Sequence, residues 1–388
     1  MNAVPTFESL LAPASQRPLS GTVRFGMLGT FPPTTCGLAT FSAALSAELG
    51  VQGSEVGVVR VADGTESSDS RIVGELVNGS AASVAACVAS LNQNDVAVIQ
   101  YGDGLYGGAH GDELLNVIDG LQVPSIAVVH SVLENPAPHQ RWVLERVAAT
   151  AGRVVVMSEA ARERLCGAYG IDRRKLVMIP HGATLPTTPR VKRAARPIIL
   201  TCGLLGPGKG IERVIDAMPS LQSVAGRPRY LVAGRTHPKV LASEGEAYRE
   251  ARLEQVKQLG VADSVSFDDR HYDRSALTTL LQSAAVIVLP YDSTDQVTSG
   301  LLVDAVASGR PVVATAFPHA VELLRNGAGI IVPHDDPDAM AGALRRVLTQ
   351  PRLAGAMAAG ARELAPAMAW PVVAAAYVQL GLRLLADR

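Results

Sequence analysis

Two hydroxyl side chains and a glycine, in the run Thr298-Ser299-Gly300, stand where a helix is predicted to begin. The apolar runs Val286–Leu289 and Pro311–Thr315 flank this helix and read as buried strands, so the segment predicts a βαβ unit. The first amides of a helix have no partner inside it and lie at the positive end of its dipole. We therefore expect the backbone amides of Ser299, Gly300 and Leu301 to bind an anionic phosphate.

Two further polar side chains belong to the same segment. Asp304 lies about one turn inside the predicted helix and offers a carboxylate to a hydroxyl pair such as that of a ribose, while Gln296 lies in the preceding loop. A capped helix between two core strands would account for Thr298 and Ser299, but not for Gln296 or for an acid at position 304. The segment therefore predicts a site for a nucleotide-linked ligand.

A glycine-rich loop, Gly203-Leu-Leu-Gly-Pro-Gly208-Lys209-Gly210, lies between a predicted strand and a predicted helix. Glycines such as Gly203 and Gly208 let backbone amides approach a phosphate, and Lys209, which we expect to be exposed, adds positive charge. The spacing almost matches a nucleotide-triphosphate loop, but Gly210 replaces the hydroxyl residue that would bind magnesium. The dinucleotide-binding spacing is also absent, so the loop fits a diphosphate better than either of those ligands.

The N-terminal half carries a second loop of this kind, which runs from Gly29 to Gly37 between a predicted strand and a predicted helix. Its Pro-Pro pair makes it longer and stiffer than an ordinary βα turn needs, which favours a binding role for the backbone around Gly37. His130 ends another predicted strand in this half, at the sheet edge where ligands of open parallel sheets collect. A single histidine is more often structural, so position is the main argument for His130.

These motifs together resemble the signature of the retaining glycosyltransferases of family GT4. In that family two acidic residues stand eight positions apart, before and inside the helix, and Gln296 and Asp304 occupy those positions here. The runs Thr30–Phe41 and Cys202–Gly210 resemble the family's first glycine loop and its C-domain phosphate loop, so the resemblance covers nearly the whole chain. It implies an α/β protein with the GT-B fold: two Rossmann-like domains facing a central cleft, with a C-terminal helix crossing back to the N-terminal domain.

The resemblance also implies roles for individual residues. His130 would hydrogen-bond the transferred sugar and steady its cation, and Lys209 would stabilise the departing diphosphate. Asp304 would hold the ribose, and Gln296, where the family commonly has Glu, would contact sugar hydroxyls. The family usually adds an arginine just after the first glycine of the phosphate loop, where this chain has a leucine, and Arg235 is the candidate to compensate.

Short β-branched runs alternate with helical stretches along the chain, which predicts parallel sheets covered by helices. The predicted strands are Val23–Leu28, Val56–Val61, Val96–Gln100, Ser125–His130, Arg153–Met157 and Leu176–Ile179, then Ile198–Cys202, Tyr230–Ala233, Val265–Phe267, Val286–Leu289, Pro311–Thr315 and Gly329–Val332. We expect a flexible leader at 1–20, an acceptor-side domain at 21–184, a linker at 185–197, a donor-side domain at 198–366 and a crossing helix at 367–388.

Composition narrows the class of protein. A net charge of −1 gives no overall field that would favour nucleic acid. The four cysteines are widely scattered, which argues against a disulfide framework or a zinc site and for a reducing compartment. Asp336 and Asp338 precede or open a predicted helix and read as capping residues, so no metal is expected. We predict a cytoplasmic protein, with peripheral contact at the inner face of the membrane left open.

The sequence therefore predicts a metal-independent, retaining transferase that moves a hexose from a nucleoside diphosphate sugar, its co-substrate, to a sugar, lipid or small-molecule acceptor. No other cofactor is expected. Three alternatives remain at this point: a glycoside phosphorylase of the same fold, a sugar-nucleotide epimerase, and a sugar-nucleotide-binding protein without catalysis.

Overall fold

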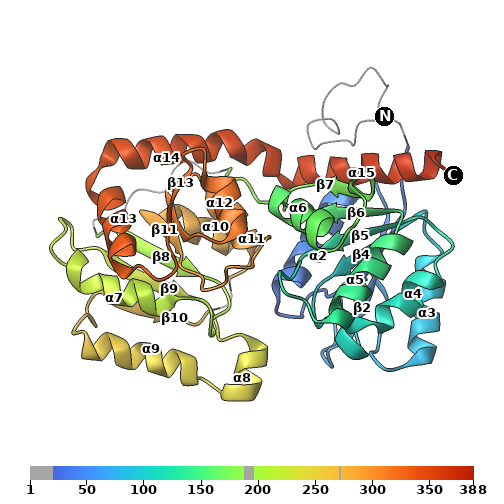
Figure 1. The fold of residues 1–388 in the computed structure, drawn as a ribbon, viewed down its shortest axis with the longest axis horizontal. Coiled ribbons are helices and arrows are strands. Elements are labelled where there is room, and N and C mark those ends of the chain that lie inside the picture. The colour runs from blue at the N-terminus through green and yellow to red at the C-terminus, as the bar shows by residue number, and fades with distance from the viewer. Residues whose placement is uncertain (1–20, 188–195, 271) are drawn as a thin grey trace. The chain divides into compact units, whose positions relative to one another are not determined.

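The computed structural model describes residues 21–187, 196–270 and 272–388 (Figure 1). The predicted leader and the centre of the predicted linker lie outside these ranges. The chain divides into two compact units, one made of residues up to Gly182 together with Trp370–Arg388, the other of Ala183–Ala369. The C-terminal segment therefore belongs to the first unit, as the GT-B resemblance implied.

The first unit is built on a parallel sheet in the order β3-β2-β1-β4-β5-β6-β7. The strands are β1 (Phe25–Gly29), β2 (Val56–Val61), β3 (Ile72–Leu76), β4 (Val96–Tyr101), β5 (Ser125–Val129), β6 (Arg153–Val156) and β7 (Leu176–Met178). The helices are α2 (Gly37–Val51), α3 (Ala81–Leu91), α4 (Glu113–Asp119), α5 (Pro138–Thr150), α6 (Glu159–Ala168) and α15 (Trp370–Ala386), with short 3-10 turns at Ala109–Gly111 and Arg173–Lys175.

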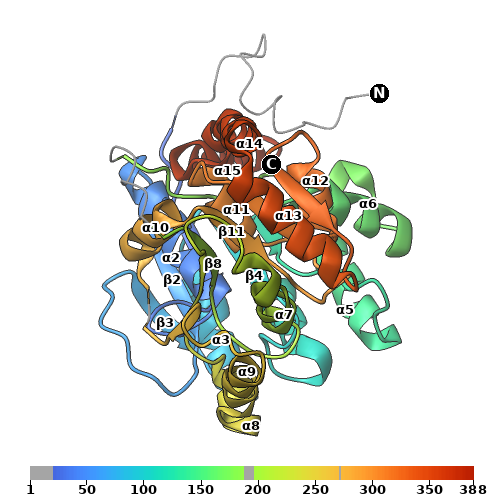
Figure 2. The same ribbon diagram turned by 90° about the vertical axis from the view of Figure 1, so that its left-hand side faces the viewer.

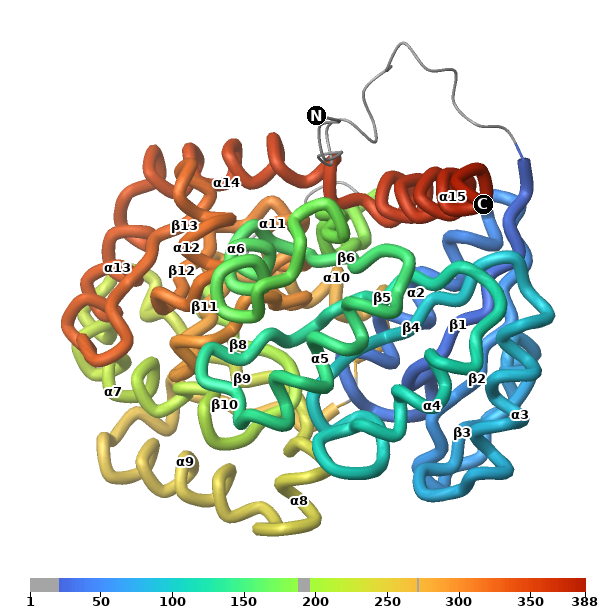
Figure 3. The backbone as a smooth tube through the Cα atoms, turned by 45° about the vertical axis from the view of Figure 1, so that its right-hand side comes forward, coloured from blue at the N-terminus to red at the C-terminus, as the bar shows by residue number. Residues whose placement is uncertain are grey.

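Successive side chains of each strand point to opposite faces of this sheet. Phe25 and Met27 of β1 pack with α2 and α15, where Tyr377 is fully buried. Helices α3, α4 and α5 contact one another in turn and are seen together with the sheet in Figure 3. Because helices cover both faces of the sheet, its central strands are continuous apolar runs in the sequence. These runs are why the central strands could be predicted from the sequence.

The second unit has its own parallel sheet, in the order β10-β9-β8-β11-β12-β13. Figure 2 labels its two central strands, β8 and β11. Its strands are β8 (Ile198–Cys202), β9 (Arg229–Ala233), β10 (Val265–Asp268), β11 (Val286–Leu289), β12 (Val312–Thr315) and β13 (Gly329–Val332). Its helices are α7 (Ile211–Leu221), α8 (Pro238–Glu244), α9 (Ala247–Gln258), α10 (Arg274–Ser283), α11 (Gly300–Ala307), α12 (Pro318–Leu324), α13 (Pro337–Thr349) and α14 (Pro351–Leu364), followed by a 3-10 turn at Ala365–Met368.

Two separate cores cover the faces of this second sheet. Ile198, Leu200 and Cys202 of β8 pack with α10, α11 and α12, whereas Ile199 points to the core formed with α7, α9 and α13. The strand order reverses between β8 and β11, which pair with Ile199 opposite Val286. In open α/β sheets ligands bind beyond the carboxyl ends of the strands at such a reversal. The loops that follow β8 and β11 are therefore the places to look for a site.

The sequence missed one strand, β3, at Ile72–Leu76. This strand lies at the edge of the first sheet, contains Gly74, and leaves Val73 58% exposed, so it lacks the buried apolar run that marks the other strands. Among the described residues, no helix is both long enough and apolar enough to cross a membrane.

Candidate active site

The glycine loop after β8 is fixed by backbone contacts with the neighbouring loops. The Gly203 amide donates to Ala233 O at 2.9 Å, and the Leu205 amide donates to Arg235 O at 2.8 Å. Gly210 has φ +62°, and a Cβ there would lie 1.7 Å from Pro290 O, so no other residue fits at the start of α7. The loop is therefore pinned between the ends of β9 and β11.

Lys209 is held more closely than its loop position suggested. Its Nζ lies 4.7 Å from the centre of the Tyr291 ring, a cation–π contact, and the residue is half-buried rather than exposed. Burial lowers the pKa of Lys209. The expectation of an exposed lysine was wrong, because Tyr291, directly after β11, provides a surface on which the side chain lies. The ammonium group is thus oriented before any ligand arrives.

Helix α11 begins at Gly300 with Ser299 as its N-cap, within the run where the sequence predicted its start. The Ser299 hydroxyl accepts a hydrogen bond from the Leu302 amide at 3.2 Å, and the Ser299 amide donates to Nδ1 of His319 at 2.9 Å. The Ser299 amide is therefore already engaged in this state of the protein. The amides of Gly300 and Leu301, the first two residues of the helix, remain the candidates for binding an anion.

Gln296 is held by two hydrogen bonds in the turn that leads into α11. Its side-chain Nε2 donates to the backbone carbonyl of Thr298 at 3.1 Å, and its backbone carbonyl accepts from the His319 amide at 3.3 Å. This arrangement leaves the side-chain oxygen as the group that Gln296 can offer to a ligand hydroxyl. Within the described part of the chain, the buried Thr298 Oγ1 has no hydrogen-bond partner, so the turn also holds an unsatisfied polar atom.

Asp304 lies half-buried on α11. Burial raises the pKa of Asp304 to about 7, against the opposing effect of the positive charge of Arg274. Burial, and then the Asp304 carboxylate, raise the pKa of Cys202, at the end of β8, to about 12. Asp304 therefore lies near the end of β8 in a poorly solvated environment. A ligand that donates hydrogen bonds to its carboxylate would lower the pKa of Asp304 again.

The second positive charge expected for a diphosphate is not where the family usually has it. Arg235 is exposed, and its Nε donates to Asp269 O at 3.2 Å. One residue that the sequence analysis did not single out carries positive charge near the glycine loop: Arg213 of α7, which forms an ion pair with Asp292. His237 also lies near Lys209, but burial and then the charge of Lys209 lower the pKa of His237, which favours its neutral form.

His130 of the first unit directly follows β5. Its Nε2 lies 2.6 Å from Gln100 Oε1, and its amide donates to Tyr101 O at 2.9 Å. Because an amide oxygen only accepts, the ring carries its proton on Nε2 and is left with an unprotonated Nδ1. Burial, and then the charge of His181, lower the pKa of His130 to about 3, so the ring is neutral at ordinary pH.

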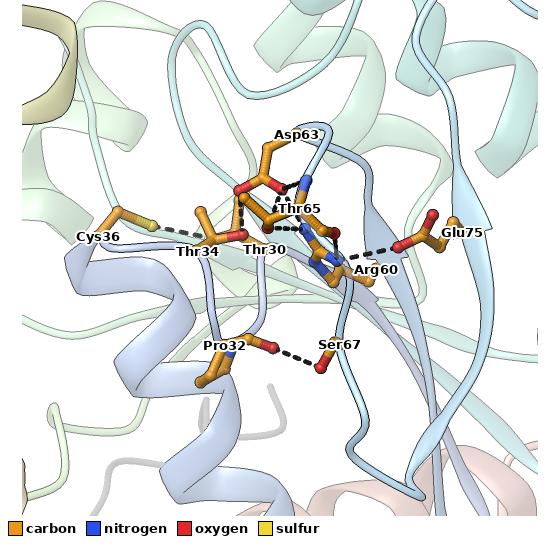
Figure 4. A network of polar contacts seen from close by, with 9 residues as sticks. All are labelled: Thr30, Pro32, Thr34, Cys36, Arg60, Asp63, Thr65, Ser67 and Glu75. Carbon is orange, nitrogen blue, oxygen red and sulfur yellow. Dashed lines mark hydrogen bonds and ion pairs between the residues drawn. The ribbon is translucent and has the colours of Figure 1, made fainter.

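The loop before α2 is held by the loop that follows β2 (Figure 4). Thr34 Oγ1 donates to Asp63 Oδ2 at 2.6 Å, and Ser67 Oγ donates to Pro32 O at 3.0 Å. Asp63 in turn pairs with Arg60, a fully buried arginine. Burial alone would raise the pKa of Asp63, but hydrogen bonds from Thr34 and Thr65 and the charge of Arg60 lower it to about 2.

This network presents the N-terminus of α2 in a fixed position. Cys36 is the N-cap residue, and its Sγ accepts from the Ala39 amide at 3.3 Å and contacts Thr30 Oγ1 at 3.3 Å. Gly37 opens the helix with open space around the position of a Cβ, so its backbone can be approached closely. The expected binding role of Gly37 has this geometry in its favour and stays a prediction.

Comparison with known proteins identifies the family. Residues 196–350 match the model described as "Glycosyl transferases group 1", and residues 36–185 match "Glycosyltransferase Family 4". The chain belongs to glycosyltransferase family 4. The two matches together cover most of the chain, and the glycine loop after β8 lies within the match at 196–350.

Individual relatives agree with this family. A D-inositol 3-phosphate glycosyltransferase of Kineococcus radiotolerans is 28% identical over 276 residues, which are 65% of this chain and 62% of that protein. The chain spans about three fifths of the length of the curated relatives it matches.

Solved structures share the fold at low sequence identity. Sucrose-phosphate synthase from Thermosynechococcus elongatus superposes with a TM-score of 0.73 at 17% identity, covering 94% of this chain and 100% of that chain. Anabaena Alr3699/HepE in complex with UDP gives a TM-score of 0.72 at 16% identity, covering 90% and 97%. These similarities show the GT-B fold.

Among the described residues of this glycosyltransferase, no group of three or more His, Cys, Asp or Glu side chains could hold a metal ion. Asp336 instead caps α13, because its Oδ1 accepts a hydrogen bond from the Ala339 amide at 2.7 Å. The capping interpretation of this acid is confirmed.

Proposed function

We propose that the protein transfers a hexose from a nucleoside diphosphate sugar to a hydroxyl group of an acceptor. One observation carries this proposal: Lys209, the first amides of α11, Gln296 and Asp304 all follow β8 or β11, the two strands at which the order of the second sheet reverses. A positive side chain, helix-end amides and a carboxylate form the set of groups that a nucleoside diphosphate needs.

The proposed donor contacts divide by chemistry. Lys209 and the amides of Gly300 and Leu301 would bind the diphosphate, and Asp304 would accept hydrogen bonds from the ribose hydroxyls. Gln296, whose side-chain oxygen is left available, would accept a hydrogen bond from a hydroxyl of the sugar. The backbone at Gly203 and Gly208, both with positive φ, would let the diphosphate approach the loop.

We further propose that transfer proceeds with retention and without a metal. The bond between the anomeric carbon and the diphosphate oxygen would break, and its electron pair would leave with the diphosphate. The acceptor oxygen would form the new bond on the same face, and its proton would pass to a diphosphate oxygen. Lys209 and the helix amides would stabilise the charge that develops on the leaving group.

His130 fits the sugar in this reaction because its ring is neutral. A protonated imidazole would repel the positive charge that develops on the sugar, whereas a neutral ring with an unprotonated Nδ1 does not. The low pKa of His130, about 3, keeps it in the neutral form throughout the working range of pH.

The relatives indicate which donors and acceptors to test. Their printed names include a D-inositol 3-phosphate glycosyltransferase, a phosphatidyl-myo-inositol mannosyltransferase and a GDP-mannose-dependent enzyme. We propose a sugar, lipid or small-molecule acceptor for this protein, and a cytoplasmic location that allows contact with the inner face of the membrane.

The test begins with nucleotide binding. Calorimetry and thermal unfolding with UDP, GDP and ADP should identify one that binds, and at one hundred times its dissociation constant it should add about 2.7 kcal/mol of stability. The failure of all three to bind would refute the proposal at its first step. With the matching donor, sugar transfer to an alcohol separates a transferase from a phosphorylase, which needs phosphate, and from an epimerase, which releases no nucleotide.

A further inference from the structure

A hollow on the first unit combines an exposed tryptophan with polar side chains, and it includes none of the residues discussed above. It has a volume of about 710 Å³ and is formed by residues at and around helices α4 and α5. Its polar lining consists of Asp112, Asn116, Asp119, His139 and Arg146, and its other lining residues are Trp142 and Leu115.

Trp142 is unusual in this chain. The sequence has two tryptophans, of which Trp370 is 5% exposed in the core whereas Trp142 is 49% exposed. An indole in a hollow offers a large, rigid surface on which a ligand can stack, and tryptophan is enriched where proteins bind other molecules. Trp142 is therefore the residue of the hollow that a ligand would contact most extensively.

The indole is held in place by its neighbours. The ring of His139 stacks on Trp142 with centroids 5.2 Å apart and an interplanar angle of 27°. His139 Nε2 in turn contacts Asp112 Oδ2 at 2.9 Å, which ties the stack to the start of α4. A ligand that stacks on Trp142 would thus meet a platform that is already oriented, and less entropy would be lost on binding.

The charges of the hollow narrow the class of ligand. Two carboxylates, Asp112 and Asp119, face one guanidinium, Arg146, whose Nη2 lies 3.4 Å from Asp119 Oδ1. This balance disfavours phosphates and other anions. With Trp142 and Leu115 as the only apolar members of the lining, there is too little apolar surface for a lipid chain. Both carboxylates already have partners, Arg146 for Asp119 and His139 for Asp112, which also weakens the case for a cation. A neutral ligand rich in hydroxyl groups fits this lining best.

We propose that this hollow binds a pyranose unit of a neutral glycan. The face of a pyranose that carries C–H groups would stack on the indole of Trp142, and its hydroxyls would exchange hydrogen bonds with Asn116, Asp119 and Arg146. This site is separate from the groups proposed to bind the nucleotide sugar, and its existence does not depend on the transfer reaction. The glycan could be an acceptor that is held while its end reacts, or a chain to which the protein docks.

The two tryptophans allow a direct test in the full chain without any nucleotide. Acrylamide quenching of the intrinsic fluorescence should be dominated by Trp142, and this is checked with the Trp142→Phe variant. An array of neutral oligosaccharides of glucose, mannose and galactose, including maltoheptaose and α-(1→6)-linked mannopentaose, is then titrated. We expect at least one of them to protect Trp142 from quenching in a saturable manner.

Variants test whether the oligosaccharide binds in the hollow. Trp142→Ala, measured by calorimetry with the protecting oligosaccharide, should weaken binding at least tenfold, and Asp119→Asn should weaken it while retaining the fold. Val51→Ala, at an apolar residue that is 78% exposed at the end of α2, is the matched control and should bind as the wild type does. Circular dichroism and the melting temperature report whether each variant is folded.

Several results would overturn the proposal: no oligosaccharide protects Trp142, Trp142→Ala binds as well as the wild type, or protection is given only by oligolysine, which would make this a site for cationic peptides. If the bound glycan is also elongated and Trp142→Ala raises its KM, the site holds an acceptor. If the glycan binds without being elongated, the site serves docking. Both of these outcomes support the proposal, and the binding of the glycan to the hollow remains measurable if nucleotide binding fails.

Discussion

The backbone amide of Ser299 donates a hydrogen bond to Nδ1 of His319 at 2.9 Å, and the amide of His319 donates to the carbonyl of Gln296 at 3.3 Å. His319, which is 3% exposed, therefore forms hydrogen bonds with both ends of the turn formed by residues 296 to 299. Because Nδ1 accepts, the ring carries its proton on Nε2. This links the position of Gln296 to the position of the first amides of α11, so the groups proposed to bind the sugar and the phosphate are positioned together.

The first prediction concerns this histidine. In His319→Asn the side-chain oxygen lies at nearly the position of Nδ1 and can accept from the Ser299 amide, whereas in His319→Gln it lies one bond further away. The loss of one hydrogen bond costs about 0.5–1.5 kcal/mol, so we expect kcat/KM to fall roughly two- to tenfold in the Gln and Ala variants and to be largely retained in Asn. Equal activity of the Asn and Gln variants would show that only bulk matters at this position.

The second prediction concerns Lys209. Lys209→Ala removes the charge proposed to neutralise the departing diphosphate, and a lost charge-assisted contact of about 1.5–3 kcal/mol corresponds to a roughly ten- to hundredfold fall in turnover. Because the half-buried side chain lies on the Tyr291 ring, we also expect a loss of stability of about 0.5–2 kcal/mol, the range for cation–π contacts from exposed to desolvated sites. Lys257→Ala is the control, since Lys257 is 72% exposed on α9. Wild-type kinetics in Lys209→Ala would move the phosphate site elsewhere.

The third prediction concerns the network around Arg60. Asp63→Asn leaves the buried Arg60 with Glu75 as its remaining carboxylate partner. Because Asp63 itself is largely exposed, we expect a loss of about 1.5–3 kcal/mol of stability, typical of one charge-assisted hydrogen bond. The control Asp172→Asn removes a carboxylate from the exposed pair with Arg174 and should change stability much less. Urea unfolding measures both changes.

The pKa of Asp63 gives this prediction a pH dependence. Its value in the folded protein, about 2, is below the ordinary value of 3.8, so its contribution to stability is complete above pH 4 and is lost as the pH falls through 2. The Asp63→Asn variant should therefore differ from the wild type less at pH 2 than at pH 6. An equal difference at both values would contradict the role given to the carboxylate.

The fourth prediction concerns metals. We expect activity to survive EDTA, because the proposed leaving-group contacts come from Lys209 and from backbone amides. A complete loss of turnover on chelation, restored by magnesium or manganese, would show that a cation does this work instead. Calcium, added in the same experiment, controls for charge alone.

Much of the fold could be predicted because its strands are buried on both faces. β2, β8, β11 and β13 have the predicted bounds, and most other strands differ by one or two residues at an end. The edge strand β3 could not be found, because exposed Val73 and the neighbouring Gly74 break the apolar run. Local pattern thus locates central strands and fails where burial is partial.

The site was predicted less completely, for a different reason. Spacing along the chain singled out Gln296, Asp304 and the glycine loop of the candidate site, because these residues lie in the loops and the helix that follow β8 and β11. His319 and Asp63 act through tertiary contacts with segments 20 and 29 residues away, and no local spacing records such a partner. Their positions soon after β12 and β2, near the carboxyl edge of a sheet, were the signal that could have found them.

The last prediction separates Asp304 from Gln296. Asp304→Ala should weaken nucleotide binding itself, because the ribose is recognised before any bond breaks, whereas Gln296→Ala should lower turnover more than nucleotide affinity, because its contact is with the moving sugar. Calorimetry with the diphosphate and kinetics with one donor give both quantities for each variant. Normal nucleotide binding by Asp304→Ala would show that the eight-residue spacing of Gln296 and Asp304 is a coincidence.

The pKa of Asp304 sharpens this comparison. Ribose hydroxyls donate best to an ionised carboxylate, and burial raises the pKa of Asp304 to about 7, so nucleotide affinity should rise with pH between 6 and 8 in the wild type. Asp304→Asn should remove that rise, and Gln296→Ala should keep it. The raised pKa also means that ionising Asp304 destabilises the fold, with a cost that grows as the pH rises from about 4 to 7, so Asp304→Asn should gain stability relative to the wild type at pH 8 and not at pH 4. If affinity for the nucleotide is flat across pH 6 to 8 while this stability difference is present, Asp304 is a buried acid that the ribose does not touch.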